Sequence, residues 1–421
     1  MKRKSMLWLF SLLLLVGIML TGCGGGGNQT STSDQSEKSA NDSSSSSASS
    51  GGEYSQGATD TTIKIGNWAT QSGSAALYGP IAKGIDAYLK HVNDQGGVNG
   101  RKFEFVTYDE EYQPSRAVAV ARKLIQEDKV FAIVGNDCTS CNKAALPLFQ
   151  DSGIPVVGPS SGADLFVDPV IPNVFGLLTN YSVEGRIFAQ YAIEDLGAKK
   201  VGIFYQNDDF GKSGYLAAKD ELAKLGAELV AEVPYNSTDV DFSSGALKMK
   251  QANPEVILSF SITKPTAAIK KELHDLDVNV PFIVTGVTGS DNNLFELAGE
   301  AWSNVYSSSW LNLVGSDDEK VNAYIETLKK YYPDVNPSGP AQWGWAEAEV
   351  LVEGIKRAGD NLTWENLIKS LETMDQWNEG MAFNVTYGPN NHYGSTSVFI
   401  IKDQDGQMVK HSDILTYEVG E

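Results

Sequence analysis

The sequence is short of histidine, cysteine and basic residues. Its 421 residues include 4 histidines and 3 cysteines, and 53 acidic residues outnumber 33 basic ones, giving a formal charge of −20. Nucleic-acid binding needs clustered Lys and Arg, so this balance argues against it. The histidines are scattered, and the motif HExxH is missing. We therefore expect no enzyme, no cofactor and no bound metal.

Long hydrophobic runs are also scarce, and one lies at the N-terminus. It extends from Met6 to Leu20 after three basic residues, and it is short for a transmembrane span, which needs ~20 apolar residues. The layout is that of a secretory signal, and Leu-Thr-Gly-Cys at 20–23 resembles the bacterial lipobox. The resemblance implies that a signal peptide, residues 1–22, is removed and that Cys23 is lipidated. The alternative is an uncleaved anchor followed by a chance cysteine.

The polar segment after Cys23 is poor in large hydrophobic residues. Residues 24–60 are rich in Gly, Ser and Asn and contain one large apolar side chain, Tyr54. Such a segment buries too little apolar surface to offset its ordering entropy. We expect residues 23–60 to form a lipidated, disordered tether. The working part would then lie on the extracytoplasmic face of the bacterial cell membrane.

The two other cysteines form a CxxC motif at Cys138 and Cys141. A local disulfide, a zinc site and a thioredoxin-like redox motif are the alternatives for such a pair. A zinc site needs two further ligands, and the sequence has no second CxxC. We favour structural or pocket-lining cysteines, with a local disulfide among the alternatives, over redox chemistry.

The remaining 361 residues alternate short β-branched runs with longer amphipathic ones. The first series predicts strands at 62–66, 103–108, 130–135 and 154–157, and helices at 78–92, 115–126 and 142–151. The second predicts helices at 181–196, 214–225, 242–251 and 265–276, and strands at 200–205, 228–234, 256–260 and 282–284. Further helices are expected near 319–330, 342–357 and 363–371, with strands near 382–385 and 397–401. The pattern predicts an α/β protein with two doubly wound parallel-sheet lobes.

Ligands of open parallel sheets bind beyond the carboxyl ends of the strands. Six loops follow predicted strands and are rich in Gly, Ser and Thr: 67–79, 135–142, 158–164, 206–211, 260–264 and 285–291. A single loop of this composition is ordinary turn chemistry. Six of them at facing edges favour a binding cleft between the lobes.

Several segments, in order, resemble the type I periplasmic binding proteins. They are 63–66, 73–79, 96–101, 108–109, 117–124, 133–135, 153–156, 159–160, 297–300 and 387–395. The branched-chain amino acid binding proteins of ABC transporters are the group they are most similar to. The resemblance implies two lobes joined by a multi-crossover hinge, with lobe 1 at 61–178 and 308–385, lobe 2 at 179–307 and 386–412, and a C-terminal tail at 413–421. It also implies a small-molecule ligand, delivery to ABC permease subunits and a monomeric protein.

The family's ligand contacts transfer to ten positions of this sequence. They are Tyr78, Cys138, Thr139, Ser140, Ser160, Ser161, Gly162, Phe210, Thr263 (or its neighbour Ile262) and Val287. Amino acid binders of this group place an acid after the 282–284 strand, to pair with the ligand's ammonium. Here Gly286 or Val287 occupies that place, and Asp137 or Asp291 would replace the acid only with its side chain turned inward. A buried ammonium without a counter-charge is costly.

The leading interpretation is a lipid-anchored solute-binding protein of an ABC importer. Its ligand would be a branched-chain or other amino acid, an amide or a small aromatic carboxylate. The alternatives are a ligand-sensing receptor component that acts through a separate partner and, less favoured, an exported hydrolase. Trp343 and Trp345 are expected in the core or the hinge.

Overall fold

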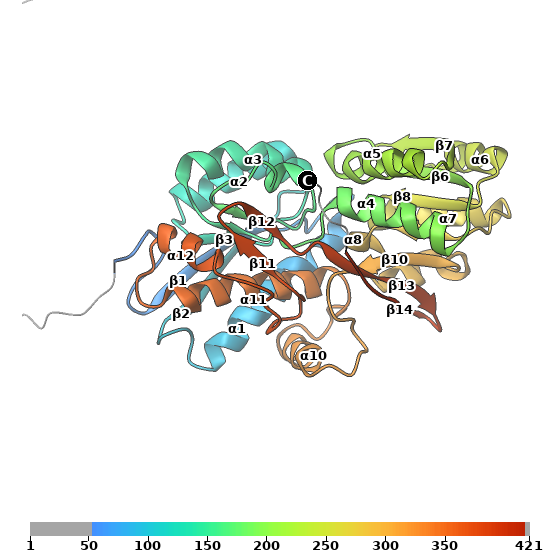
Figure 1. The fold of residues 1–421 in the computed structure, drawn as a ribbon. Coiled ribbons are helices and arrows are strands. Elements are labelled where there is room, and N and C mark those ends of the chain that lie inside the picture. The colour runs from blue at the N-terminus through green and yellow to red at the C-terminus, as the bar shows by residue number, and fades with distance from the viewer. Residues whose placement is uncertain (1–52, 417–421) are drawn as a thin grey trace, which may run out of the picture. The chain divides into compact units, whose positions relative to one another are not determined.

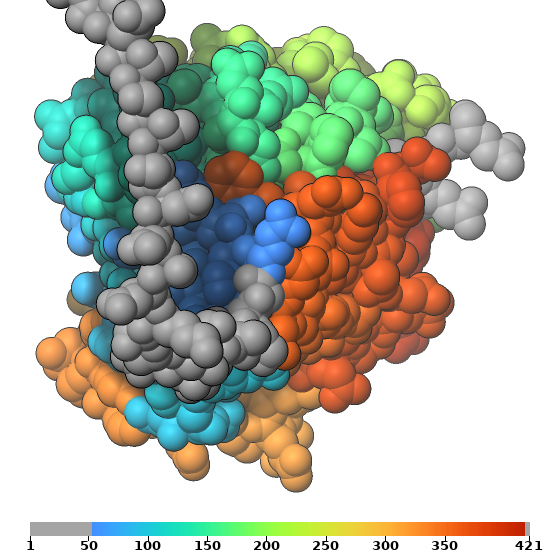
Figure 2. Space-filling model, turned by 90° about the vertical axis from the view of Figure 1, so that its left-hand side faces the viewer, coloured from blue at the N-terminus to red at the C-terminus, as the bar shows by residue number. Residues whose placement is uncertain are grey.

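The computed structural model describes residues 53–416. The expected signal peptide, the lipidation at Cys23 and the tether up to residue 52 lie outside the described residues. The last part of the expected tether is packed onto the folded chain, which corrects the predicted boundary at residue 60. Ser55 N–H donates to Leu362 O (2.9 Å), and the buried Arg101 donates to Thr59 O (3.0 Å). Figure 2 shows these first described residues, in blue, beside orange residues from late in the chain.

The first sheet is parallel throughout and has the strand order β2-β1-β3-β4-β5. Its strands are β1 (Thr62–Trp68), β2 (Lys102–Tyr108), β3 (Ala132–Val134), β4 (Val156–Val157) and β5 (Val174–Phe175). β3 and β4 are fully buried, as expected for central strands with helices on both faces.

Helices cover both faces of this sheet, and those on one face come from distant parts of the chain. α2 (Pro114–Gln126) packs against α3 (Thr139–Ser152), whereas α1 (Pro80–Asp94) packs against α11 (Pro340–Ala358), which is followed by α12 (Trp364–Leu371). Figure 1 shows the two groups on opposite sides of the sheet. Gly84 of α1 permits the close approach, because a Cβ there would lie 1.8 Å from Ala341 O. α10 (Glu319–Tyr331) also contacts α1.

The second sheet has seven strands in the order β14-β13-β10-β9-β8-β6-β7. β6 (Lys200–Gln206), β7 (Glu228–Tyr235), β8 (Val256–Phe260), β9 (Phe282–Val284) and β10 (Val305–Ser309) are parallel. β13 (Ser397–Gln404) and β14 (Gln407–Thr416) add to the sheet in antiparallel fashion.

Four main helices flank the second sheet. They are α4 (Tyr181–Gln190), α5 (Asp209–Lys224), α6 (Ser243–Ala252) and α7 (Thr263–Asp275). α4 packs on α5, and α6 packs on α7. α4 continues into a π-helical turn, Tyr191–Asp195, while the short α8 (Gly286–Gly289) and α9 (Asn293–Ala298) follow β9. The two series predicted from the sequence therefore form two α/β lobes, as expected.

The chain passes between the lobes more than once. It leaves the first sheet after β5, returns after β10 to form α10, α11 and α12, and enters the second sheet again at β13. Just before that last passage, β11 (Thr386–Gly388) and β12 (Asn391–Gly394) form a hairpin beside β5. His392 of β12 is buried and stacks on Phe175, with ring centroids 3.9 Å apart.

Three predicted boundaries are corrected by these strands. The expected tail at 413–421 begins too early, because β14 pairs with β13 through Thr416. The expected strand at 382–385 is replaced by β11, which starts at Thr386 and lies with β12 beside the first lobe, not the second. The expected start of the returning lobe 1 segment at residue 308 falls inside β10, which belongs to the second sheet.

Within residues 53–416, none of the helices has both the length and the apolar character needed to cross a membrane.

Candidate ligand-binding site

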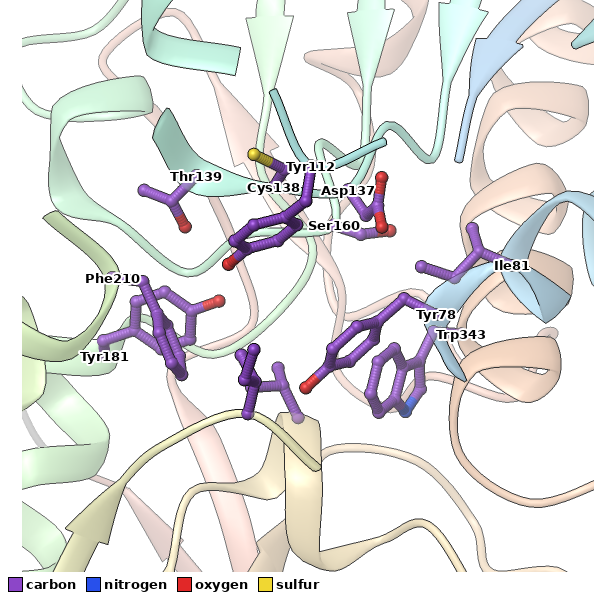
Figure 3. Close-up of a pocket in the computed structure, with 12 residues that line it drawn as sticks. Tyr78, Ile81, Tyr112, Asp137, Cys138, Thr139, Ser160, Tyr181, Phe210 and Trp343 are labelled. Atoms are coloured by element: carbon purple, nitrogen blue, oxygen red, sulfur yellow. The ribbon is translucent and has the colours of Figure 1, made fainter. Parts of the chain in front are cut away.

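A cavity lies between the two lobes, at the carboxyl ends of the parallel strands. The loops after β1, β2, β3 and β4 line it from the first lobe, and those after β6, β8 and β9 line it from the second. Figure 3 shows its wall, made of Tyr78, Ile81, Tyr112, Asp137, Cys138, Thr139, Ser160, Tyr181, Phe210, Ile262, Val287 and Trp343. The position is the one that the six glycine- and serine-rich loops predict.

The N-terminus of α3 forms the first-lobe end of this wall. Cys138 is the N-cap residue, with φ of 68°, and its sulfur accepts the Cys141 N–H at 3.2 Å. A disulfide joins Cys138 to Cys141, so the local disulfide is the one of the three alternatives that the structure contains. The first amides of a helix have no partner within the helix and favour an anionic group. Thr139, the first residue of α3, therefore lies at a position that favours an anionic group.

Two hydroxyl groups of the first lobe are held by neighbours behind the wall. Thr139 Oγ1 lies 2.7 Å from Ser161 Oγ, and Ser160 Oγ donates to both carboxylate oxygens of Glu347, at 2.7 and 2.8 Å. Glu347 comes from α11 and is fully buried, and burial raises its pKa well above the ordinary value. Burial therefore favours the neutral form of this side chain, which avoids an uncompensated charge.

Tyr78 reaches from the first lobe to the second. Its hydroxyl lies 3.3 Å from Thr288 Oγ1 and accepts from Thr263 Oγ1 at 3.5 Å. Burial raises the pKa of Tyr78 to about 12. The hydroxyl is thus neutral and joins the lobes by hydrogen bonds.

Aromatic rings make up much of the remaining wall. Phe210 lies in the first turn of α5 and packs edge-on against Tyr181, with centroids 5.0 Å apart and 77° between the planes. Tyr78 lies beside Trp343 at 5.9 Å. In Figure 3 the hydroxyls of Tyr78, Tyr112 and Tyr181 point toward the space between the labelled side chains. The wall is therefore apolar with a few polar groups, as is usual for sites that bind small molecules.

Asp137 is the one ionisable acid in the wall, and a second acid stands behind it. Both oxygens of Asp137 accept from Thr70 N–H, at 3.1 and 3.2 Å. Glu110 accepts from the Thr70 hydroxyl and from Tyr112 N–H, the latter at 3.2 Å. Burial raises the pKa of both acids, and the charge of Glu110 raises that of Asp137 further. Burial of the two adjacent acids therefore favours the form in which the pair retains one proton.

Six of the ten residues transferred from the family line this cavity. They are Tyr78, Cys138, Thr139, Ser160, Phe210 and Val287. The other four, Ser140, Ser161, Gly162 and Thr263, are not in the wall. Ser161 and Thr263 hold wall hydroxyls by hydrogen bonds, while a Cβ at Gly162 would lie 2.3 Å from Thr179 O, so that position requires glycine. Whether the ten bind a ligand stays a prediction.

Sequence reasoning missed Ile81, Tyr112, Tyr181 and Trp343 as wall residues. Tyr112 lies after β2, on a loop that was not among the six, and Tyr181 begins α4 directly after the chain crosses between lobes. Trp343 was expected in the core or hinge, and its side chain is indeed 3% exposed while also facing the cavity. A search for tyrosines directly after every predicted strand would have found Tyr112.

The lobes touch each other around the cavity. Besides the Tyr78 contacts, Lys143 Nζ lies 2.8 Å from Asp209 Oδ1, and Gln206 Nε2 donates to Tyr112 OH at 3.4 Å. The cavity volume is about 30 Å³, room for about two water molecules. This space is smaller than an amino acid, so binding one requires the side chains of the wall or the lobes to move.

One group of potential metal ligands occurs within residues 53–416. Single ligand atoms of Glu110, Cys138 and Cys141 lie within 4.8 Å of one another. The two sulfurs are joined in the disulfide, whereas metals bind the thiolate form of cysteine. The oxidised chain therefore does not offer this group as a metal site.

Known proteins resemble the chain over most of its length. A family model described as "Periplasmic binding protein" matches residues 62–407. The leucine-, isoleucine-, valine-, threonine- and alanine-binding protein of Pseudomonas aeruginosa is 25% identical over 305 residues, which cover 71% of this chain and 79% of that protein.

Two solved structures that share this fold are described with different ligands. A branched chain amino acid ABC transporter from Thermus thermophilus with bound valine has a TM-score of 0.80 at 20% identity, with 86% of this chain and 98% of that chain covered. A fatty acid ABC transporter substrate-binding protein from Thermomonospora curvata has a TM-score of 0.79 at 22% identity, with 87% and 95% covered. The family model matches most of the chain, from the first residue of β1 to the first residue of β14. The chain therefore belongs to the periplasmic binding protein family.

Proposed function

We propose that the chain is the lipid-anchored substrate-binding protein of an ABC importer, held on the extracytoplasmic face of the bacterial cell membrane through Cys23. It captures a small polar solute between its lobes and presents the closed form to the permease subunits. The solute is a branched-chain or other amino acid, an amide or a small aromatic carboxylate.

The observation that carries this proposal is the cavity shared by both lobes. Thr139 and Ser160 reach it from the first sheet, whereas Phe210 and Val287 reach it from the second. A solute that contacts both sides favours the closed arrangement, because its binding free energy is larger there. The relatives found are solute-binding proteins and not enzymes, which supports a role without catalysis.

A thermal-shift screen of the purified full-length chain tests the proposal. A ligand that binds only the folded state raises the melting temperature, by an amount that grows with its concentration above Kd. We expect a rise with at least one compound among amino acids, their amides and small aromatic carboxylates. No rise with any of them would contradict solute binding, and turnover of any of them would favour an enzyme.

A test of the anchor is separate from the ligand test. Cys23→Ser removes the acylated side chain and should release the chain from bacterial membranes, whereas Cys138→Ser should leave it membrane-bound. Retention of the Cys23→Ser variant in washed membranes would contradict the lipid anchor and favour an uncleaved apolar segment.

A further inference from the structure

The charge balance around the cavity is one-sided. Among its twelve lining residues, in the described part of the chain, Asp137 is an acid and none is Lys, Arg or His. Two further acids, Glu110 and Glu347, lie behind the first-lobe wall. A ligand that carries only a negative charge would find the α3 N-terminus but would be repelled by any ionised member of this group.

Asp137 and Glu110 are buried together with few partners. Asp137 is 3% exposed and Glu110 is 0% exposed, and Glu110 Oε2 has no hydrogen-bond partner among residues 53–416. Their other oxygens accept from Thr70 and Tyr112. Two adjacent buried carboxyls cannot both be ionised, so one proton stays between them. A cation that reached Asp137 from the cavity would replace that proton and allow the pair to ionise.

We propose that Asp137, backed by Glu110, binds the positively charged group of the ligand, and that the solute carries an ammonium group beside its carboxylate. The carboxylate would lie at Thr139 on the α3 N-terminus, and the ammonium at Asp137, two residues earlier. The inference rests on the proposed function and narrows its ligand to amino acids and related zwitterions. It places the counter-charge on the first lobe, whereas the resemblance implied an acid after β9, where Gly286 and Val287 stand.

The alternative role of the pair is purely structural. Thr70, Glu110 and Asp137 come from the loops after β1, β2 and β3, so their hydrogen bonds also tie three loops together. The two roles differ in what they predict for variants. A structural tie predicts that Asp137→Asn and Glu110→Gln weaken binding of every ligand alike, whereas a charge contact predicts a loss confined to ligands with an amino group.

Calorimetric titration of the purified full-length chain with matched ligand pairs separates these roles. The pairs are L-leucine, L-valine, L-phenylalanine and L-glutamine, each with the acid in which hydrogen replaces the amino group. We expect the wild type to bind the amino member of at least one pair more tightly, by at least about tenfold, because the analogue leaves Asp137 without a partner. Asp137→Asn should abolish that preference. Glu110→Gln should keep it, since it removes the competing charge and retains an oxygen for Thr70.

Asp403→Asn is the matched control, because Asp403 is an acid of β13 that does not line the cavity. Equal or tighter wild-type binding of the analogues, or an Asp137→Asn variant that weakens both members of a pair equally, would overturn the inference while leaving solute binding intact. If Asp137→Asn does not fold, the wild-type preference and its retention in Glu110→Gln decide the question. Failure of all eight compounds to bind would overturn the inference, whereas the proposed function is decided by the thermal-shift screen, which also includes amides.

Discussion

The side chains around the cavity divide into residues that face it and residues that hold those in place. Thr139 and Ser160 face the cavity, and Ser161 and Glu347 hold their hydroxyls. The sequence identified Ser160 and Ser161 together, since they are adjacent, but it gave no sign of Glu347, which is 187 positions further along. Such a partner is brought in by the packing of α11 on the first sheet, and no local pattern encodes it.

Thr139→Val should weaken ligand binding about tenfold without unfolding the protein. The methyl group fills the space of the hydroxyl, but the hydrogen-bond donor expected at the ligand carboxylate is lost. Titration calorimetry gives the affinity, and thermal unfolding checks the fold. Ser161→Ala is the matched control, because it removes the same Thr139–Ser161 hydrogen bond (2.7 Å) and keeps the Thr139 hydroxyl. Unchanged affinity in Thr139→Val would reject the carboxylate position.

Asp291 should make the protein less stable as pH rises from about 4 to about 6. The residue is 1% exposed, Oδ2 has no partner among residues 53–416, and burial raises its pKa from 3.8 to about 6. The folded state therefore binds more protons than the unfolded state in this window, so stability is full below pH 3.8 and is lost as pH rises to about 6. The loss amounts to about 3 kcal/mol.

Asp291→Asn removes this titration and is compared with the wild type by urea unfolding at several pH values. The difference in unfolding free energy, wild type minus variant, should fall by about 2 kcal/mol between pH 4 and pH 6.5. Parallel curves for the two proteins would show that folding does not raise the pKa of Asp291.

At the scale of elements, the long periodic segments were predictable and their first turns were not. The helix predicted at 214–225 begins at Asp209, because Asp208 Oδ1 accepts the N–H groups of Phe210 and Gly211, at 3.1 and 3.2 Å. The helix predicted at 142–151 begins at Thr139, with Cys138 as its cap. The added first turns of both helices contain candidate ligand residues. The residues just before these turns are typical of loops in the sequence, but in the structure they cap the helices.

β10 was missed for a related reason. Its sequence, Val-Tyr-Ser-Ser-Ser, has few of the β-branched residues that mark strands. All five residues are buried, and the serines are satisfied inside the protein: Ser307 Oγ donates to Val284 O at 2.7 Å, and Ser308 Oγ donates to the buried Glu184. A strand stabilised by such distant partners has no local sequence signal.

The Cys138–Cys141 disulfide should stabilise the first turn of α3. Closing a loop of this length contributes about 2 kcal/mol by restricting the unfolded chain. Urea unfolding with and without a phosphine reductant should show this loss in the wild type, and ligand affinity should fall with it, since Cys138 lines the cavity. The double variant Cys138→Ser with Cys141→Ser should not respond to the reductant. Identical wild-type unfolding curves in both conditions would contradict a stabilising role.

At the scale of the whole molecule, the lobes are in contact, so the free energy of closure contributes to ligand affinity. Lys143 and Asp209 form an ion pair across the lobes at 2.8 Å, with side chains 53% and 39% exposed. Exposed pairs of this kind contribute ~0.2–1 kcal/mol. Their effect on affinity is correspondingly small.

Lys143→Ala should weaken ligand binding by less than about fivefold, and the weakening should diminish at high salt. Calorimetry at two ionic strengths measures this. Lys369→Ala is the matched control, because Lys369 pairs with Glu365 within α12 and does not join the lobes. A Lys143→Ala variant with wild-type affinity at low salt would show that this pair does not contribute to closure.

The crystal structure of the chain with the tightest ligand from the thermal-shift screen tests the central claim most directly. The account predicts the solute enclosed between the lobes, in contact with Thr139 on one side and Phe210 on the other, with its amino group at Asp137. A solute bound outside the space shared by the two sheets would contradict it, as would a complex in which only one lobe touches the ligand.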